Sequence, residues 1–283
     1  MAYERGQALA ACRATLLLAM VVLLPCAHAA DVVKIGGSGT ALGAMRLLGD
    51  AYEKANRDAN VIVVANLGGS GGIRAMLEGA IDIAVNARPL KAAEAERGGQ
   101  AYLLGRTPFV FVVGEDRSET AITESELVEI FRGSRTRWAD GVPVRLSLRP
   151  ADDSDNDAID ALSAAMKQAR QAAHQRPGMF FAGSDQENAD YLEKIPGALG
   201  GIGLSVILSE RRRLRPLRLD GAAPTPAALA AGKYRFYKPL YAVVKQGASP
   251  AARRFLAFVA SAHGTEALRS VGIVPVADGA GVR

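Results

Sequence analysis

The sequence predicts an α/β fold with parallel sheets, built as two medium-sized lobes. Two observations indicate this class. Short apolar runs alternate with helical patterns along the chain of 283 residues, which is typical of strands joined by helices. The order of strand, glycine-rich loop and helix also occurs twice between residues 31 and 77. A chain of this length can bury enough apolar surface for two lobes.

Apolar periodicity places the individual elements. Leu42, Met45 and Leu48 share one face of the first predicted helix, and Thr123 with Glu126 forms a capping box at the start of another. The predicted strands are 32–37, 61–67, 81–87, 107–116, 142–149, 200–207, 214–220 and 238–246, and the predicted helices are 40–56, 73–79, 123–133, 154–174, 186–194, 250–261 and 264–271.

Residues 1–29 have the pattern of a secretory signal peptide. Arg5 and Arg13 precede the apolar run ATLLLAMVVLL, and the sequence AHA ending at Ala29 provides the small residues that cleavage requires. We expect cleavage after Ala29 and a periplasmic protein. No later apolar run is long enough to span a bilayer, so we expect no membrane span in the mature chain. Cys12 and Cys26 leave with the signal peptide, which excludes a disulfide.

The net charge of +5 raises the hypothesis of nucleic-acid binding. Export argues against it, and so does the lack of a basic strand interleaved with aromatic residues. The densest basic run, RRRLRPLR at residues 211–218, is interpreted as a solvated helix end that continues into an edge strand. We therefore expect no nucleic-acid partner.

The stretch GGSGG, from Gly68 to Gly72, allows two interpretations. It matches G-x-S-x-G, the nucleophile elbow of serine hydrolases, with Ser70 as the nucleophile. It also matches a glycine-rich helix start whose free N–H groups hold an anion. Only two predicted strands precede Ser70, and after residue 29 the histidines are His174 and His263, neither in a glycine-flanked loop at a strand end. The hydrolase therefore lacks a general base, and we expect no catalytic residue and no enzymatic activity.

A second glycine-rich helix start, IGGSGTALGAM at residues 35–45, precedes the first and contains Ser38 and Thr40. The carboxyl ends of adjacent parallel strands meet in one crevice, so both loops are expected to face the same ligand. Glycine admits an anion close to the backbone, while Ser70 and Thr40 add hydroxyl donors. An alternative is that both loops are simply tight strand-to-helix turns. The pair of loops favours an anion site.

The residues do not favour a nucleotide, a metal or another cofactor. The sequence has no G-x-x-x-x-G-K-[ST], and neither glycine loop completes G-x-G-x-x-G. Asp153, Asp155 and Asp157 match the first half of a calcium loop, but Ala158 and Ala164 replace its glycine and bidentate glutamate. We interpret the acidic run as the start of a helix.

Together the motifs resemble the phosphate-binding proteins of bacterial phosphate ABC transporters, which are type 2 periplasmic binding proteins. The likeness lies in the order of GGSGTALG, GGSGGIRAMLEGAIDIAVNARPL, ELVEIFRGSRTRWADG, GALGGIGLSVI, LRLDGAAPTPAALAAGKYRFYKPLYAVV and VGIVPV. The resemblance implies two α/β lobes joined by two crossing strands, with the ligand between the lobes. On this basis the chain divides into a signal peptide (1–29), lobe 1 (30–112), lobe 2 (113–238) and a return to lobe 1 (239–283).

The resemblance also implies a set of ligand-binding residues. The first loop contributes Thr40 and the amide of Ala41, and the second contributes Ser70 and the amide of Gly71. The remaining predicted binding residues are Arg88, Arg149 and Ser154.

The second-lobe loop departs from the family pattern, because Asp155 and Asn156 replace a Gly-Thr pair. We expect Asp155 and Asp157 to lie in the first turn of the helix and to repel an oxyanion there.

The sequence thus predicts a solute-binding protein for phosphate or another small oxyanion. The resemblance implies an ABC permease as partner, and we expect a monomer. Two alternatives from other classes stay open: a secreted serine hydrolase that uses Ser70, and a sensor or adaptor that keeps the fold without transport.

Overall fold

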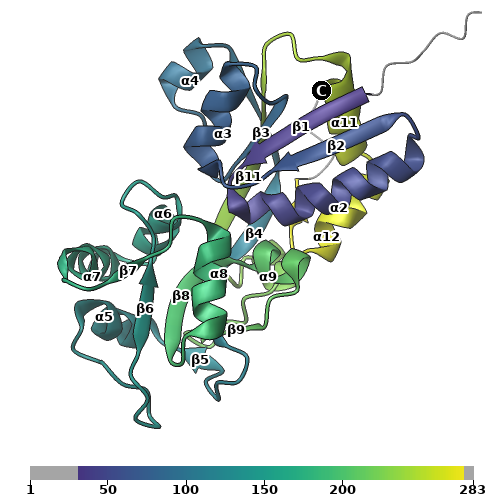
Figure 1. The fold of residues 1–283 in the computed structure, drawn as a ribbon. Coiled ribbons are helices and arrows are strands. Elements are labelled where there is room, and N and C mark those ends of the chain that lie inside the picture. The colour runs from purple at the N-terminus through teal and green to yellow at the C-terminus, as the bar shows by residue number, and fades with distance from the viewer. Residues whose placement is uncertain (1–30, 277–283) are drawn as a thin grey trace, which may run out of the picture. The chain divides into compact units, whose positions relative to one another are not determined.

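The computed structural model describes residues 31–276 of the chain. The predicted signal peptide and its cleavage site lie outside the described residues. Within residues 31–276, no helix is both long enough and apolar enough to cross a membrane. The described chain contains two groups of strands that share one long strand, with helices packed against them (Figure 1).

Lobe one is built from both ends of the described chain. Its strands are β1 (Asp31–Gly37), β2 (Ala59–Val64), β3 (Ile83–Asn86), the first part of β4 (Gly99–Gly114), β11 (Tyr237–Lys245) and β12 (Val274–Pro275), and its helices are α2 (Gly39–Ala55), α3 (Gly68–Leu77), α4 (Ala92–Glu96), α11 (Pro250–Val259) and α12 (Ala262–Ser270). The strand order is β2-β1-β3-β11-β4. β1 pairs in parallel with β2 and β3, so the loops after β1 and β3 leave the same edge of the sheet.

Lobe two is formed by the middle of the chain. Its strands are the last part of β4, β5 (Ala121–Ile122), β6 (Arg145–Leu148), β7 (Phe180–Phe181), β8 (Ala198–Gly203), β9 (Leu214–Pro216) and β10 (Arg218–Leu219), and its helices are α5 (Glu124–Arg132), α6 (Asp155–Asp160), α7 (Ala164–Gln175), α8 (Asp185–Lys194), α9 (Leu204–Glu210) and α10 (Pro226–Ala230). The sheet continues from β4 through β8 and β6 to β7. β6 pairs in parallel with both of its neighbours.

β4 belongs to both lobes. Its residues 99–108 pair with β11, and its residues 109–112 pair with β8. β11 runs antiparallel to β4 and returns the chain to lobe one after lobe two is complete. The two neighbouring strands β4 and β11 therefore connect the lobes.

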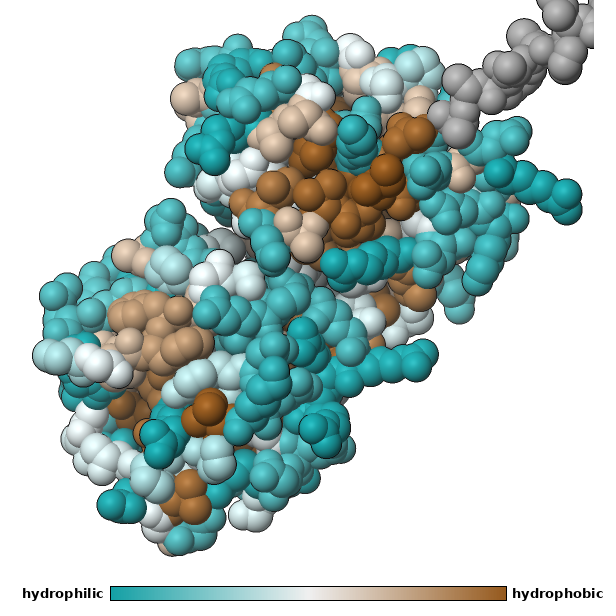
Figure 2. Space-filling view, viewed as in Figure 1, coloured by the Kyte–Doolittle hydropathy of each residue, from teal (hydrophilic) through white to brown (hydrophobic). Residues whose placement is uncertain are grey.

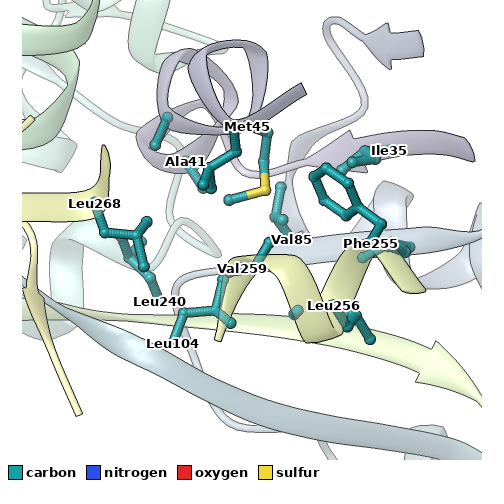
Figure 3. Close-up of a cluster of buried hydrophobic side chains, with 14 of the residues drawn as sticks. Ile35, Ala41, Met45, Val85, Leu104, Leu240, Phe255, Leu256, Val259 and Leu268 are labelled. Carbon is teal, nitrogen blue, oxygen red and sulfur yellow. The ribbon is translucent and has the colours of Figure 1, made fainter. Parts of the chain in front are cut away.

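Two large hydrophobic cores hold these sheets and helices together. The core of lobe one draws on residues between 33 and 104 and between 240 and 273, and Figure 3 shows Met45 of α2 and Phe255 of α11 pointing into it. The predicted apolar face of the first helix is confirmed, because Leu42, Met45 and Leu48 are almost fully buried. A second core draws on residues between 109 and 234. Each lobe therefore has its own apolar interior.

One face of lobe one stays apolar at the surface. Figure 2 shows hydrophobic surface over β1 and β2, where Val32 and Ile62 are exposed. Val33 and Ile35 lie on the opposite face of β1 and are fully buried. This alternation follows from the two-residue period of a strand.

The structure corrects some predicted boundaries. The predicted helix at 154–174 is wrong as a single element, because the chain turns between α6 and α7. Ser163 has extended backbone angles there, and its side chain accepts a hydrogen bond from the amide of Met166, which starts a new helix. The predicted strand at 200–207 ends at Gly203, where α9 begins. The predicted capping box of Thr123 and Glu126 is confirmed.

Candidate functional site

A polar cleft lies where the glycine-rich loops of lobe one meet the loops of lobe two. Its volume is about 360 Å³. Lobe one contributes residues around the starts of α2 and α3 and the end of β3, lobe two contributes the loop after β6 and the start of α8, and β11 contributes one lysine. The lining residues are Gly37, Ser38, Gly39, Leu42, Asn66, Leu67, Gly68, Gly69, Ser70, Gly71, Arg74, Asn86, Arg88, Arg149, Pro150, Asp152, Asp153, Ser154, Gly183, Ser184, Asp185, Gln186 and Lys238.

Two glycines allow the first wall of the cleft to form. Gly37 has a φ of +140°, and a Cβ atom there would lie 2.1 Å from the carbonyl oxygen of Val85. A Cβ atom on Gly72 would lie 2.5 Å from the Cα atom of Gly37. No larger residue fits without moving the backbone, since these contacts are to main-chain atoms. The start of α3 can therefore pack directly on the end of β1.

Ser70 and Arg88 meet on this first wall. Arg88 Nη2 lies 3.2 Å from Ser70 Oγ, to which it donates a hydrogen bond. The same guanidinium forms an ion pair with Glu94, with 2.7 Å between Nη2 and Oε1, and the hydrogen bond from Arg88 lowers the pKa of Glu94. Among residues 31–276, no side chain caps the start of α3. The amides of Gly68, Gly69 and Ser70 at the start of α3 are therefore available beside the hydroxyl of Ser70 and the guanidinium of Arg88. The amide of Gly71 is in position to bond the carbonyl of Leu67 within the helix.

In the first glycine-rich loop, the hydroxyl group of Thr40, which was predicted to bind the ligand, does not face the cleft. Thr40 and Ala41 are almost fully buried and are not among the residues that line the cleft. Thr40 Oγ1 donates a hydrogen bond of 3.1 Å to Asp185 Oδ1. The side-chain donor of this loop is thus used by a carboxylate of lobe two.

The lobe-two side of the cleft holds a charge cluster, which we define as Arg149, Lys238, Asp153, Asp155 and Asp185. All but the half-buried Asp153 are buried, and all but Asp155 line the cleft. Arg149 Nη2 lies 2.6 Å from Asp153 Oδ2 and 4.0 Å from Asp185 Oδ2, and Arg149 Nε lies 3.7 Å from Asp155 Oδ2. Lys238 Nζ donates a hydrogen bond to Asp155 Oδ1 and lies 3.8 Å from Asp185 Oδ1. Three carboxylates therefore compensate two cations without any ligand.

The pKa values reflect this mutual compensation. Burial raises the pKa of Asp155 to about 6, although Lys238 acts in the opposite direction. Burial also opposes ionisation of Asp185, but Lys238, Arg149 and the hydrogen bond from Thr40 lower its pKa below the ordinary value. Burial alone would lower the pKa of Lys238, and the facing carboxylates raise it instead. Both cations of the cluster therefore stay charged at neutral pH.

The pKa of Asp155 predicts a pH dependence of stability. The folded-state value of about 6 lies above the ordinary value of 3.8, so between these values the folded protein retains a proton that the unfolded chain releases. The contribution of Asp155 to stability therefore falls as the pH rises through this window. We expect the free energy of unfolding of the parent protein, relative to Asp155→Asn, to fall by about 2 kcal/mol between about pH 4 and about pH 6.5.

Urea unfolding of both proteins across this range measures the difference. Asp157→Asn is a matched control, because Asp157 is an exposed carboxylate of the same helix. A difference between the parent and Asp155→Asn that is flat or rises with pH would contradict the assignment.

The predicted placement of Asp155 and Asp157 in the first turn of α6 is confirmed. Their repulsion of an oxyanion stays a prediction, whereas the expected contact with the helix amides is wrong for Asp155. Its carboxylate does not meet the helix donors of α6 but pairs with Lys238, a buried cation from β11. The amide of Asp155 is instead capped by Asp153 Oδ1 at 2.9 Å. Asn156 Nδ2 donates to the carbonyl of Pro150 at 2.7 Å. The start of α6 is thus already occupied by groups of its own loop.

Of the seven predicted binding residues, the structure brings five to the cleft. Ser70, Gly71, Arg88, Arg149 and Ser154 line it. Thr40 and Ala41 lie behind its surface. As ligand contacts, all seven stay predictions.

Sequence reasoning missed Lys238 and Asp185. One signal was available for Lys238, because it follows an aromatic segment outside any predicted helix and precedes the apolar run PLYAVV. A charged residue next to such a run needs a charged partner if it is buried. The cluster of aspartates at 152–157 is such a partner. No comparable signal marks Asp185.

The chain is similar in sequence and in fold to known proteins. A family model described as a PBP superfamily domain matches residues 25–263. The phosphate-binding protein PstS of Borreliella burgdorferi is 23% identical over 256 residues, which cover 87% of this chain and 90% of the relative. A putative phosphate ABC transporter substrate-binding protein of Clostridium perfringens, solved with bound phosphate, superposes with a TM-score of 0.73 at 19% identity and covers 87% of this chain and 99% of its own.

A more distant structure has the same fold. The ABC-type phosphate transport receptor of Vibrio cholerae superposes with a TM-score of 0.59 at 20% identity, over 86% of this chain and 99% of the receptor. Identities at this level show shared fold and not shared ligand. The family model, however, spans well over half of the chain, and the chain therefore belongs to the PBP superfamily, with the fold of the type 2 periplasmic binding proteins.

Proposed function

We propose that this protein is an exported solute-binding protein that binds phosphate or a related small oxyanion in the cleft. The observation that carries the proposal is the wall formed by α3: its free amides, the hydroxyl of Ser70 and the guanidinium of Arg88 converge on one side of the cleft. A helix start of this kind attracts an anion through its partial positive charge. The names of the relatives, which refer to phosphate binding, support the same ligand class.

The fold and relatives support further parts of the proposal. The protein delivers its ligand to an ABC permease and reaches the periplasm through its signal peptide. Lobe 1 comprises 30–112 and 239–283 and lobe 2 comprises 113–238, which agrees roughly with the extent of the two cores. We expect the protein to act as a monomer.

Catalysis by Ser70 is not part of the proposal. Ser70 Oγ receives a hydrogen bond from Arg88, and a guanidinium cannot act as a general base near neutral pH. His174 packs against Phe181, and within residues 31–276 no histidine lines the cleft. We therefore propose that Ser70 binds the ligand and does not attack it.

Ser70→Ala tests the proposed binding role. We expect it to weaken phosphate binding by about 1–2 kcal/mol, the contribution of one hydrogen bond to a charged group. Isothermal titration calorimetry with phosphate measures the loss. Ser118→Ala is the control, because Ser118 is exposed and does not line the cleft. If Ser70→Ala instead removed an esterase activity and left phosphate binding unchanged, the hydrolase alternative would be favoured.

A further inference from the structure

A second cavity adjoins the cleft and has no counterpart in the proposed function. Its volume is about 730 Å³. It shares three lining residues with the cleft, namely Arg88, Ser154 and Lys238. A ligand bound at Arg88 can therefore extend from one space into the other.

One wall of the second cavity is an aromatic sheet surface. Tyr237, Pro239 and Tyr241 of β11 line the cavity and are exposed or half-buried, whereas Leu240 and Lys238, which also lines the cavity, are buried. This alternation places Tyr237, Pro239 and Tyr241 on one face of the strand. This part of the lining is therefore aromatic and largely apolar.

A cation lies on the same wall. Arg106 of β4 is the register partner of Pro239, and its guanidinium carbon lies 5.1 Å from the ring centroid of Tyr237. Such a stacked guanidinium presents both a planar surface and hydrogen-bond donors.

The opposite wall is a helix face with small side chains. Ser154, Asp157, Ala158 and Ala161 line the cavity from the α6 segment. Their spacing of three and four residues places them on one side of the helix. The two alanines leave room next to the aromatic wall. We refer to the part of this cavity between Tyr237 and Ala158 as the slot, because a planar group there would contact both linings.

The charges around the slot favour an anion. Arg106 and Arg235 are exposed, and among residues 31–276 neither side chain has an ion pair or a hydrogen bond. Arg235 lies over the ring of Phe236, with 5.7 Å to the centroid. Asp157 is the carboxylate among the lining residues. The cationic groups therefore outnumber the anionic ones.

We propose that the cleft and the second cavity together bind an aromatic phosphomonoester. The phosphoryl group lies at Ser70 and Arg88, and the aromatic ring lies in the slot between Tyr237 and Ala158. This inference rests on the proposed function, because it uses the same anion wall. It differs by assigning the ligand an organic substituent.

Calorimetric titrations with phosphate, methyl phosphate and phenyl phosphate test the inference. The two esters have the same charged head and differ in the group that would enter the slot. We expect phenyl phosphate to bind at least about tenfold more tightly than methyl phosphate, because one stacked ring contributes on that order. Tyr237→Ala should remove most of this preference and leave the affinity for methyl phosphate unchanged. Phe181→Ala is the matched control, because Phe181 is 39% exposed, as Tyr237 is, and lines neither space.

The outcomes separate the inference from the proposed function. Equal affinities for the two esters, or a preference that survives Tyr237→Ala, would overturn the slot and leave oxyanion binding intact. Failure of phosphate and both esters to bind would overturn the slot and the proposed function together. Tyr237 is exposed, so loss of folding is not expected to obscure the result, and circular dichroism of each variant checks this.

Discussion

Lys238→Met is expected to lower the free energy of unfolding by about 3–5 kcal/mol, the usual consequence of removing one partner from a buried ion pair. Lys238 is 2% exposed and donates to Asp155, which is completely buried. Methionine fills a similar volume but leaves the carboxylate without its main counter-charge. Arg149 cannot replace the lysine fully, because its Nε lies 3.7 Å from Asp155 and its Nη2 already binds Asp153.

Chemical unfolding of the parent and the variant measures this loss. Lys167→Met is the control, because Lys167 is an exposed lysine without an ion pair among the described residues. The double variant Lys238→Met/Asp155→Leu should regain much of the stability, since it removes the uncompensated carboxylate as well. A loss below about 1 kcal/mol in the single variant, which is typical of exposed pairs, would show that the pair is not a buried one.

Asp185→Asn is expected to increase the affinity for phosphate by about 10- to 100-fold, equivalent to about 1.4–2.7 kcal/mol. Asp185 lines the cleft and accepts the hydrogen bond of Thr40. Its carboxylate oxygens lie 3.8 Å from Lys238 Nζ and 4.0 Å from Arg149 Nη2. Its charge repels a bound oxyanion and weakens the attraction of both cations. Asparagine keeps the shape and can still accept the hydrogen bond from Thr40, so mainly the charge changes.

Parallel calorimetric titrations at low salt compare the two proteins. Asp50→Asn is the matched control, because Asp50 is an exposed carboxylate of α2 that lines neither cavity. The gain in phosphate affinity should be smaller if Lys238 is also replaced, because the cation that Asp185 no longer neutralises is then missing. Unchanged or weaker phosphate binding by Asp185→Asn would contradict the interpretation that the carboxylates of the cluster compete with the ligand.

Local patterns predicted most of the secondary structure. The apolar face of α2 and the capping box at Thr123 follow from residues three and four positions apart, which interact whatever the tertiary fold. The break between α6 and α7 was missed. The break depends on Ser163, whose side chain caps the start of α7. This local cap wins over a continuous helix only in the folded protein, where the adjacent Leu162 is buried.

By itself, the sequence determined that two glycine-rich helix starts lie at one edge of a parallel sheet, whereas Ser70 and Arg88 were assigned to one site only by the family resemblance. The order of adjacent strands brings such loops together wherever the sheet forms. The tertiary structure alone decided that Thr40 faces Asp185, 145 positions away, and that Lys238 pairs with Asp155, 83 positions away. The physical reason is desolvation. A lysine and an aspartate are ordinary surface residues in a sequence, and they must form a pair only when folding removes both from water.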